Sequence, residues 1–443
     1  MEVIVKKTWT KPLLLIALLA IALGLFACGG GGQQTTGGEG DVQQAEFVPA
    51  LDTETACSIT VAGAYSNFEA LEAVFDLFKE YYPNVDLSYV KLDNYNQTIV
   101  TALEGDEAPN VFVCLPWMRN KPEYADVFAA TENLADESLG IDLGCIREGL
   151  VLKNADGSVS MVPVFTTTLG VLVNEDLFAK EGIEIPKTYD ELLAACEAFK
   201  AKGYASPLAG YMNDKMCYYM TYPDIAFEVS KNPDAVAALN SLEPEAGEYL
   251  RPSMERLEDF FTYDYLNKEV CGEIADDYES LIFRFFEGDI PMMIAQGDIA
   301  SGTRKREAMS EAFTANPFKY SLHPMPFSQD SPIFLNLYSL SFSVNKNCEN
   351  LDMTNEFMRF LVRPESLDLM ASIKHLGTPC HGLTADEMYA SFDEVDAEHT
   401  LYAEALGISD EAIVQMRAIA YQISMEGVSA DEALANYGSY TNG

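Results

Sequence analysis

Short apolar runs alternate with amphipathic segments along most of the chain. Three such runs near its beginning predict buried strands at Ser58–Ala62, Leu87–Leu92 and Val111–Leu115. Between the first two, apolar residues recur at spacings of three and four, as expected for one helix face: Phe68, Leu71, Phe75, Phe78 and Tyr82. Further apolar strands are predicted at Leu169–Val173, Ile290–Ala295 and Phe334–Val344. This order predicts an α/β fold with mainly parallel sheets, followed by a helical and acidic remainder from about Thr384.

Turn and capping residues punctuate this pattern. Ser66 and Glu69 have the spacing of a capping box, with Ser66 as N-cap, and Thr188 and Glu191 have the same spacing before a later helix. The dipeptide Asp156-Gly157 separates two apolar runs and predicts a hairpin there.

The first fifty residues have a different composition. Lysines precede an uncharged apolar run, Leu13–Ala27, which has the pattern of a secretory signal and is short for a membrane-spanning helix. The run ends in Leu-Phe-Ala followed by Cys28, which resembles the lipobox of bacterial lipoproteins; an ordinary signal peptide or a short membrane helix is the alternative. Residues 29–50 contain little that could pack and predict a flexible linker. We therefore expect a signal peptide at 1–27, then a lipidated Cys28 and linker at 28–50, and a protein anchored on the outer face of the cell membrane, extracellular or periplasmic.

The net charge narrows the function classes. With 28 basic and 69 acidic residues the formal charge is −41, which argues against nucleic-acid binding because phosphate must be met by basic side chains. This acidity suits a well-solvated exported monomer, and a preference for cationic ligands is the alternative. The four histidines show no zinc-type spacing, so we expect no structural metal and no cofactor.

The sequence does not decide whether the cysteines form disulfides or remain free thiols. Besides Cys28 there are eight, with wide spacings and no CxxC motif: Cys57, Cys114, Cys145, Cys196, Cys217, Cys271, Cys348 and Cys380. An exported chain permits disulfides, but buried free thiols fit the sequence as well.

Several motifs together resemble the family 1 extracellular solute-binding proteins, which include the maltose-binding protein. The most specific is the run 156–191, DGSVSMVPVFTTTLGVLVNEDLFAKEGIEIPKTYDE, and shorter matches occur at 108–111, 286–293 and 377–379. Asn110 departs from the Asp that is usual in the family. The resemblance implies a two-lobed periplasmic-binding-protein-like fold of type II, whose lobes are joined by crossover hinge strands and close on a solute. It also implies the permease subunits of an ABC importer as partners.

The expected lobes are discontinuous in sequence. We expect residues 51–166 with 337–380 to form the N-lobe and residues 167–336 with 381–443 to form the C-lobe. The crossovers are expected near Phe165–Leu169, near Asn336–Ser341 and between His375 and Thr384.

Polar and aromatic residues after strand ends are the candidate solute contacts, because ligands of open α/β sheets bind outside the carboxyl ends of the strands. The candidates are Tyr65, Ser66, Trp117, Thr167, Asn213, Tyr218 and Asp298. Each has a structural alternative: Ser66 could only cap a helix, Trp117 could pack beneath the next helix, and Thr167 could be an ordinary strand residue. A set of carboxylates and aromatic rings suits a neutral sugar.

Two other functions remain open. Asp298 with Asp214 could hold a cationic solute such as a polyamine. An enzyme on the same fold, of the thiaminase type, would place a nucleophilic Cys in the crossover loop, where this chain has Thr166, Thr167 and Thr168. Cys114 has no neighbouring histidine in sequence to activate it, so we expect no catalytic residue.

Overall fold

The structure, a computed structural model, describes residues 46–105, 107–275, 277–381 and 386–440, with the backbone alone at residues 120 and 214–217. The predicted signal peptide, Cys28 and most of the linker lie outside the described residues, and so does part of the third predicted crossover. From Val48 onward the chain forms one compact unit. Within the described ranges, no helix combines the length and the apolar character needed to cross a membrane.

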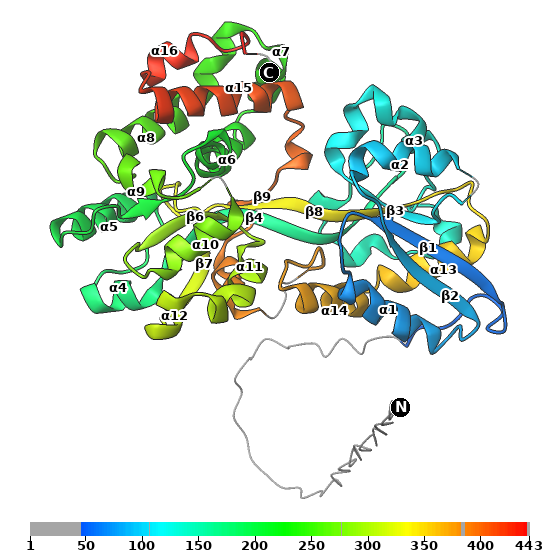
Figure 1. The fold of residues 1–443 in the computed structure, drawn as a ribbon. Coiled ribbons are helices and arrows are strands. Elements are labelled where there is room, and N and C mark those ends of the chain that lie inside the picture. Colours follow the sequence, from blue (N-terminus) through cyan, green and yellow to red (C-terminus); the bar gives the residue numbers. More distant parts are fainter. Residues whose placement is uncertain (1–45, 106, 276, 382–385, 441–443) are drawn as a thin grey trace, which may run out of the picture. The chain divides into compact units, whose positions relative to one another are not determined.

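Nine described strands form one connected hydrogen-bonded network. They are β1 (Cys57–Gly63), β2 (Val85–Lys91), β3 (Val111–Cys114), β4 (Val162–Asn174), β5 (Leu208–Ala209), β6 (Met292–Gln296), β7 (Tyr320–Pro324), β8 (Phe334–Val344) and β9 (Thr400–Tyr402). Their order is β2-β1-β3-β8-β4-β6-β5, with β7 paired to β4 and β9 paired to β8. The two longest, β4 and β8, lie at the middle of this order and carry the connection between its two ends (Figure 1).

The prediction of mainly parallel sheets is wrong. Of the eight strand pairings among the described residues, β3–β8, β4–β6, β4–β7 and β4–β8 are antiparallel. The parallel pairs are β1–β2, β1–β3, β5–β6 and β8–β9. Every antiparallel pair includes β4 or β8. These two strands run in opposite directions through the middle of the network, and each also pairs with shorter strands near its ends.

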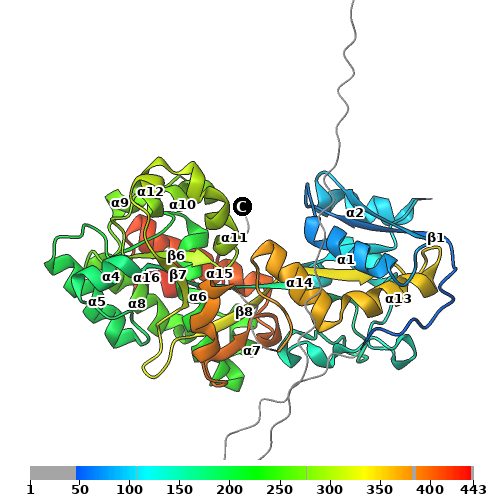
Figure 2. The same cartoon turned by 90° about the horizontal axis from the view of Figure 1, so that it is seen from below.

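Helices surround each end of this network, and Figure 2 shows the same grouping from a second direction. We call β1–β3 with their helices the first lobe: α1 (Glu69–Lys79), α2 (Tyr95–Glu104), α3 (Ala125–Ala129), α13 (Leu351–Leu361) and α14 (Pro364–Lys374). The second lobe contains β5–β7 with α4 (Glu175–Glu181), α5 (Tyr189–Ala201), α6 (Asp214–Ser230), α7 (Pro233–Ser241), α8 (Arg251–Thr262), α9 (Lys268–Gly272), α10 (Tyr278–Phe286), α11 (Ile299–Arg306), α12 (Glu311–Ala315), α15 (Asp410–Tyr421) and α16 (Ala430–Leu434).

Buried aromatic residues hold the helices of the first lobe together. Phe78 of α1 lies with its ring centroid 5.3 Å from Phe357 and 5.4 Å from Phe360, both of α13. On the sheet side, Phe68 contacts Tyr89 of β2 at 5.4 Å. Such edge-to-face contacts add to the stabilisation from burying large apolar side chains. The apolar face predicted for the first helix is therefore confirmed as a core face.

Only one of the two predicted capping boxes forms. Thr188 accepts a hydrogen bond from the Glu191 backbone N–H at 3.3 Å, and the Glu191 carboxylate accepts from the Thr188 N–H, which confirms that box. Ser66 does not cap α1, because the helix begins at Glu69 with the buried Phe68 at its N-cap position. The Glu69 carboxylate instead accepts from Lys374 at 3.2 Å.

Two other local predictions need correction. The turn at Asp156-Gly157 forms, with Gly157 at φ +85° and the Asn154 N–H donating to the Ser158 carbonyl at 2.8 Å, but its flanks are not strands and it is no hairpin. The part of the chain after residue 384 is not purely helical, since β9 pairs with β8 there. Three residues are too few to show a strand period in the sequence.

Candidate ligand-binding site

A cavity of about 480 Å³ lies where both lobes meet β8. The first lobe and the segment after it supply Leu115, Pro116, Trp117, Arg119 and Leu152. The remaining wall residues come from α6, from β8, from the segment that leads into α15 and from the first turn of α15: Tyr218, Tyr222, Leu337, Tyr338, Ser339, Ala403, Glu404, Gly407, Ile408, Ser409, Asp410 and Ile413. Two of the seven predicted contacts, Trp117 and Tyr218, therefore line one cavity from opposite lobes.

The loop after β3 fixes the position of Trp117. Pro116 occupies the start of a 3-10 helix, Pro116–Asn120, where its missing N–H costs nothing. The indole packs edge-on against Tyr124 with centroids 5.6 Å apart, and the Lys121 Nζ lies 5.2 Å from the indole centroid. Trp117 is half-buried. It thus combines the packing role that the sequence left open with a place in the cavity wall.

Two tyrosines of α6 form a stacked pair on the opposite wall. Tyr218 and Tyr222 lie four residues apart, and their rings stack with centroids 4.6 Å apart. Burial raises the pKa of both phenols, so both hydroxyls keep their protons at neutral pH and can donate hydrogen bonds. Sequence reasoning missed Tyr222, although its i,i+4 spacing from Tyr218 on a helix would have identified it.

Glu404 supplies a carboxylate with unused hydrogen-bonding capacity. Its Oε1 accepts from the Tyr338 backbone N–H at 3.1 Å. Its Oε2 is buried and has no hydrogen-bond partner among the described residues. Burial raises the pKa of the Glu404 carboxyl. No sequence signal distinguished Glu404 from the many other acidic residues, and only the fold brings it to the cavity.

Thr167 lies on the same face of β4 and β8 as the cavity. It pairs directly with Leu337, and directly opposed residues of an antiparallel ladder project their side chains to one side. Leu337 lines the cavity. The Thr167 side chain is 6% exposed, and its Oγ1 has no hydrogen-bond partner within the described ranges.

The turn after β6 brings Asp298 beside Thr167. The Gly297 N–H donates to the Thr168 carbonyl at 2.8 Å, and a Cβ on Gly297 would lie only 3.0 Å from the Thr167 Oγ1. Glycine is therefore needed for this close approach. The Asp298 Oδ1 is buried without a hydrogen-bond partner in the part of the chain that the structure describes, and burial raises the pKa of this carboxyl.

Tyr65 of the first lobe lies near Asp298. Burial and the nearby negative charge of Asp298 raise the pKa of Tyr65 to about 12. The Tyr65 ring packs against Phe68 at 4.9 Å and lies 5.0 Å from the Lys374 Nζ. Tyr65 and Asp298, which are far apart in the sequence, are thus near enough in the fold to interact electrostatically.

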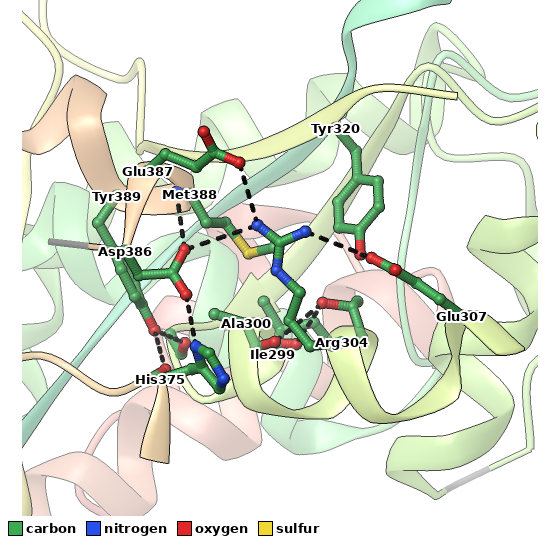
Figure 3. A network of polar contacts seen from close by, with 12 residues as sticks. Ile299, Ala300, Arg304, Glu307, Tyr320, His375, Asp386, Glu387, Met388 and Tyr389 are labelled. Atoms are coloured by element: carbon green, nitrogen blue, oxygen red, sulfur yellow. Dashed lines mark hydrogen bonds and ion pairs between the residues drawn. The ribbon is translucent and has the colours of Figure 1, made fainter. Parts of the chain in front are cut away.

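A polar network holds the turn that carries Asp298 (Figure 3). The Tyr389 hydroxyl donates to the Gly297 carbonyl and lies 3.3 Å from the His375 carbonyl. Asp386 contacts the His375 Nδ1 at 2.8 Å and Arg304 of α11 at 3.9 Å. On the other side, the Tyr278 hydroxyl donates to the Asp298 carbonyl. These contacts fix the backbone of the turn on which Asp298 lies.

Five of the seven predicted contacts do not line this cavity: Tyr65, Thr167 and Asp298, described above, and Ser66 and Asn213. Ser66 is exposed on the loop after β1, and Asn213 is half-buried just before α6. Among the described residues, no group of three or more His, Cys, Asp or Glu side chains could hold a metal ion.

Comparison with known proteins gives a consistent result. A sequence profile described as "Bacterial extracellular solute-binding protein" matches residues 63–367. The melibiose/raffinose/stachyose-binding protein MelE of Bacillus subtilis (strain 168) is 23% identical over 307 residues, which cover 68% of each chain.

Solved structures share the fold at low sequence identity. The apo form of RafE from Streptococcus pneumoniae superposes with a TM-score of 0.69 at 17% identity, covering 89% of this chain and 98% of that one. A sugar transporter of Bacillus licheniformis in complex with stachyose gives a TM-score of 0.57 at 16% identity, covering 86% and 100%. At this identity the likeness establishes the fold, which is the two-lobed α/β fold that the sequence predicted.

Proposed function

The chain belongs to the bacterial extracellular solute-binding proteins, and from that premise we propose that it captures a carbohydrate at the cavity beside β8 for an ABC importer. Members of this family bind solutes and are not enzymes, so the alternative of an enzyme on the same fold is set aside.

One observation carries the assignment to a carbohydrate. Aromatic side chains from both lobes, Trp117 and Tyr218, line the same cavity as Glu404, whose Oε2 has no hydrogen-bond partner among the described residues. Sugars present apolar C–H faces to aromatic rings and hydroxyl groups to acceptors. A buried acceptor without a partner costs about 1 to 3 kcal/mol, and a ligand hydroxyl would remove that cost.

Thr167 and Asp298 extend the proposed site along the same strand face. Each has a buried oxygen without a partner among the described residues. An oligosaccharide that reached from Trp117 to Asp298 would satisfy both oxygens and touch both lobes. Tyr65 would then cover a sugar ring from the first lobe. Contacts to both lobes give the solute a differential affinity for a closed state, which binding-driven closure requires.

The names of related proteins favour oligosaccharides of the raffinose type. MelE is described as binding melibiose, raffinose and stachyose, and RafE has been crystallised with raffinose. We therefore take raffinose and stachyose as the first solutes to test.

We also propose the membrane anchor and the lobe boundaries. A diacylated Cys28 followed by a linker would keep the protein beside its permease subunits while its lobes move. The register of β4 with β8, from Val162–Phe342 to Thr168–Asn336, supports hinges near residue 166 of β4 and near residue 337 of β8.

A panel of solutes tests the proposed function. Purified protein is melted with raffinose, stachyose, maltotriose, spermidine and single amino acids, because a ligand at 100 times its Kd stabilises a protein by about 2.7 kcal/mol. We expect a rise in Tm with at least one oligosaccharide and none with spermidine. A rise with spermidine alone would replace the carbohydrate assignment by the cationic-solute alternative, in which Glu404 and Asp298 would face the cation.

A further inference from the structure

Cys145 and Cys380 meet although they are far apart in the sequence. Cys145 ends the 3-10 helix Leu143–Cys145, which begins after Asp142. Cys380 lies in the segment that leads from α14 to the second lobe. The Cys145 Sγ donates to the Val362 carbonyl at 3.2 Å, and the two thiols are near enough for each to shift the pKa of the other.

Backbone hydrogen bonds hold the segments that contain Cys145 and Cys380 side by side. Ile146 and Cys380 form an antiparallel bridge, in which the His381 N–H donates to the Cys145 carbonyl and the Arg147 N–H donates to the Pro379 carbonyl, each at 3.0 Å. This hydrogen-bond pattern makes Ile146 and Cys380 a non-hydrogen-bonded pair, whose Cα atoms lie about 4.5 Å apart. Cys145 immediately precedes Ile146, so the backbones of the two cysteines approach to about the Cα separation that disulfides span, 4.4–6.8 Å.

The two thiols differ in a way that suits thiol–disulfide exchange. Cys145 is half-buried and can meet a small reagent, whereas Cys380 is 4% exposed. The neighbouring Cys145 thiol lowers the pKa of the Cys380 thiol, and the charge of Arg147 acts in the same direction. A thiol with a lowered pKa is the better nucleophile for closing a disulfide on a neighbouring sulfur.

We propose that Cys145 and Cys380 form a disulfide in the mature protein. A small-molecule disulfide is the oxidant: Cys145 forms a mixed disulfide with it and releases one thiol, and the Cys380 thiolate then attacks the Cys145 sulfur and releases the second. Two protein thiols and one external disulfide thus give one protein disulfide and two external thiols. The extracellular setting of the family is one in which such bonds persist.

The bond would fix the third connection between the lobes. The Gly377 carbonyl accepts from the Thr166 N–H of β4 at 2.9 Å, and the Thr378 carbonyl accepts from the Arg147 guanidinium at 2.7 Å. A covalent link at Cys380 would hold this segment against the first lobe at the point where it leaves that lobe.

Peptide mapping tests the proposal directly. The purified protein is incubated with oxidised glutathione or with a reductant, denatured without reduction, alkylated with iodoacetamide and digested. We expect one cross-linked species that joins the peptides containing Cys145 and Cys380 in the oxidised sample, and carbamidomethyl groups on both cysteines in the reduced one. Alkylation of both cysteines after oxidation, or a link to a different cysteine, would overturn the assignment.

Thermal unfolding supplies an independent readout. Because the link closes a very long loop, the oxidised protein should melt roughly 5 °C or more above the reduced one. Cys145→Ser and Cys380→Ser should each abolish this difference, while Cys57→Ser, at a half-buried position of β1, should retain it. A difference that survives in Cys145→Ser would mean that another pair is responsible.

Discussion

Thr167 of β4 and Leu337 of β8 oppose each other directly where the two long strands pair. Leu337 lines the cavity, and the Thr167 hydroxyl lies beside Gly297, the residue before Asp298. A single strand pair therefore connects the cavity wall to the turn that carries Asp298. Any movement of the lobes about β4 and β8 changes the distance between these two parts of the site.

Replacing Trp117 should weaken solute binding. Loss of the indole removes an apolar surface for a sugar ring, and we expect Trp117→Ala to raise the Kd for the best oligosaccharide roughly tenfold to a hundredfold, or about 1.4 to 2.8 kcal/mol. Calorimetric titration measures the change. Tyr263→Ala is the matched control, since Tyr263 is 53% exposed at the end of α8. A Trp117→Ala protein that binds normally but melts early would show that the indole serves only to pack on Tyr124.

Asp298→Asn should raise the stability of the unliganded protein and weaken solute binding. Burial raises the pKa of the Asp298 carboxyl, so its charged form is held at a cost in the empty protein. Removing the charge should stabilise the unliganded protein by about 1 kcal/mol at pH 7, while the solute loses an acceptor and binds more weakly. Thermal melts with and without solute measure both effects. Lower stability together with unchanged affinity would contradict a ligand-facing role for Asp298.

The stability difference between wild type and Asp298→Asn should depend on pH in a defined direction. Below about pH 4, the ordinary pKa of Asp, the carboxyl is protonated in the folded and unfolded protein, and its pKa shift contributes nothing. As the pH rises through the raised folded pKa, the wild type loses stability relative to the variant, and the loss is then constant. Urea titrations between pH 4 and pH 8 should show the variant's advantage growing with pH.

Lipidation at Cys28 can be tested independently of the folded part of the chain. Cys28→Ser should prevent acylation while leaving the remainder of the signal sequence intact. In a bacterial host we expect the wild-type protein to partition into the detergent phase of a Triton X-114 extraction and the variant into the aqueous phase. Two acyl chains are required for stable attachment, so their loss should be close to complete. Equal partitioning of both proteins would contradict lipidation at Cys28.

The sequence predicted those parts of the fold that depend on local pattern. Phe334–Val344 was predicted as an apolar run and is β8, and Thr188 with Glu191 forms the predicted cap. The antiparallel pairing was missed, because the direction in which distant strands meet is set by the path of the chain and not by their apolar pattern. β9 was missed because it is only three residues long.

The binding site could be predicted only in part for the same reason. Trp117 follows a predicted strand end, and this position indicated a place at the edge of the sheet. Glu404 comes from the part of the chain that the sequence predicted only as helical and acidic, and its hydrogen bond to the backbone of Tyr338 holds it at the cavity. Ser66 was predicted as a solute contact because it follows the first strand, with helix capping as the alternative. It does not line the cavity, and it does not cap α1 because the helix begins after the buried Phe68.

Thr188 and Ser66 offer a matched test of that difference. Thr188 accepts from the Glu191 N–H, so Thr188→Ala should lower the free energy of unfolding by about 1 kcal/mol, or roughly 2 °C in Tm for a chain of this size. Ser66 is exposed and makes no side-chain cap with α1, so Ser66→Ala should leave the Tm within about 1 °C. Differential scanning calorimetry of the two single variants and the wild type measures both. If Ser66→Ala costs as much as Thr188→Ala, α1 begins in solution where the sequence first placed it, and the burial of Phe68 does not decide the start of the helix.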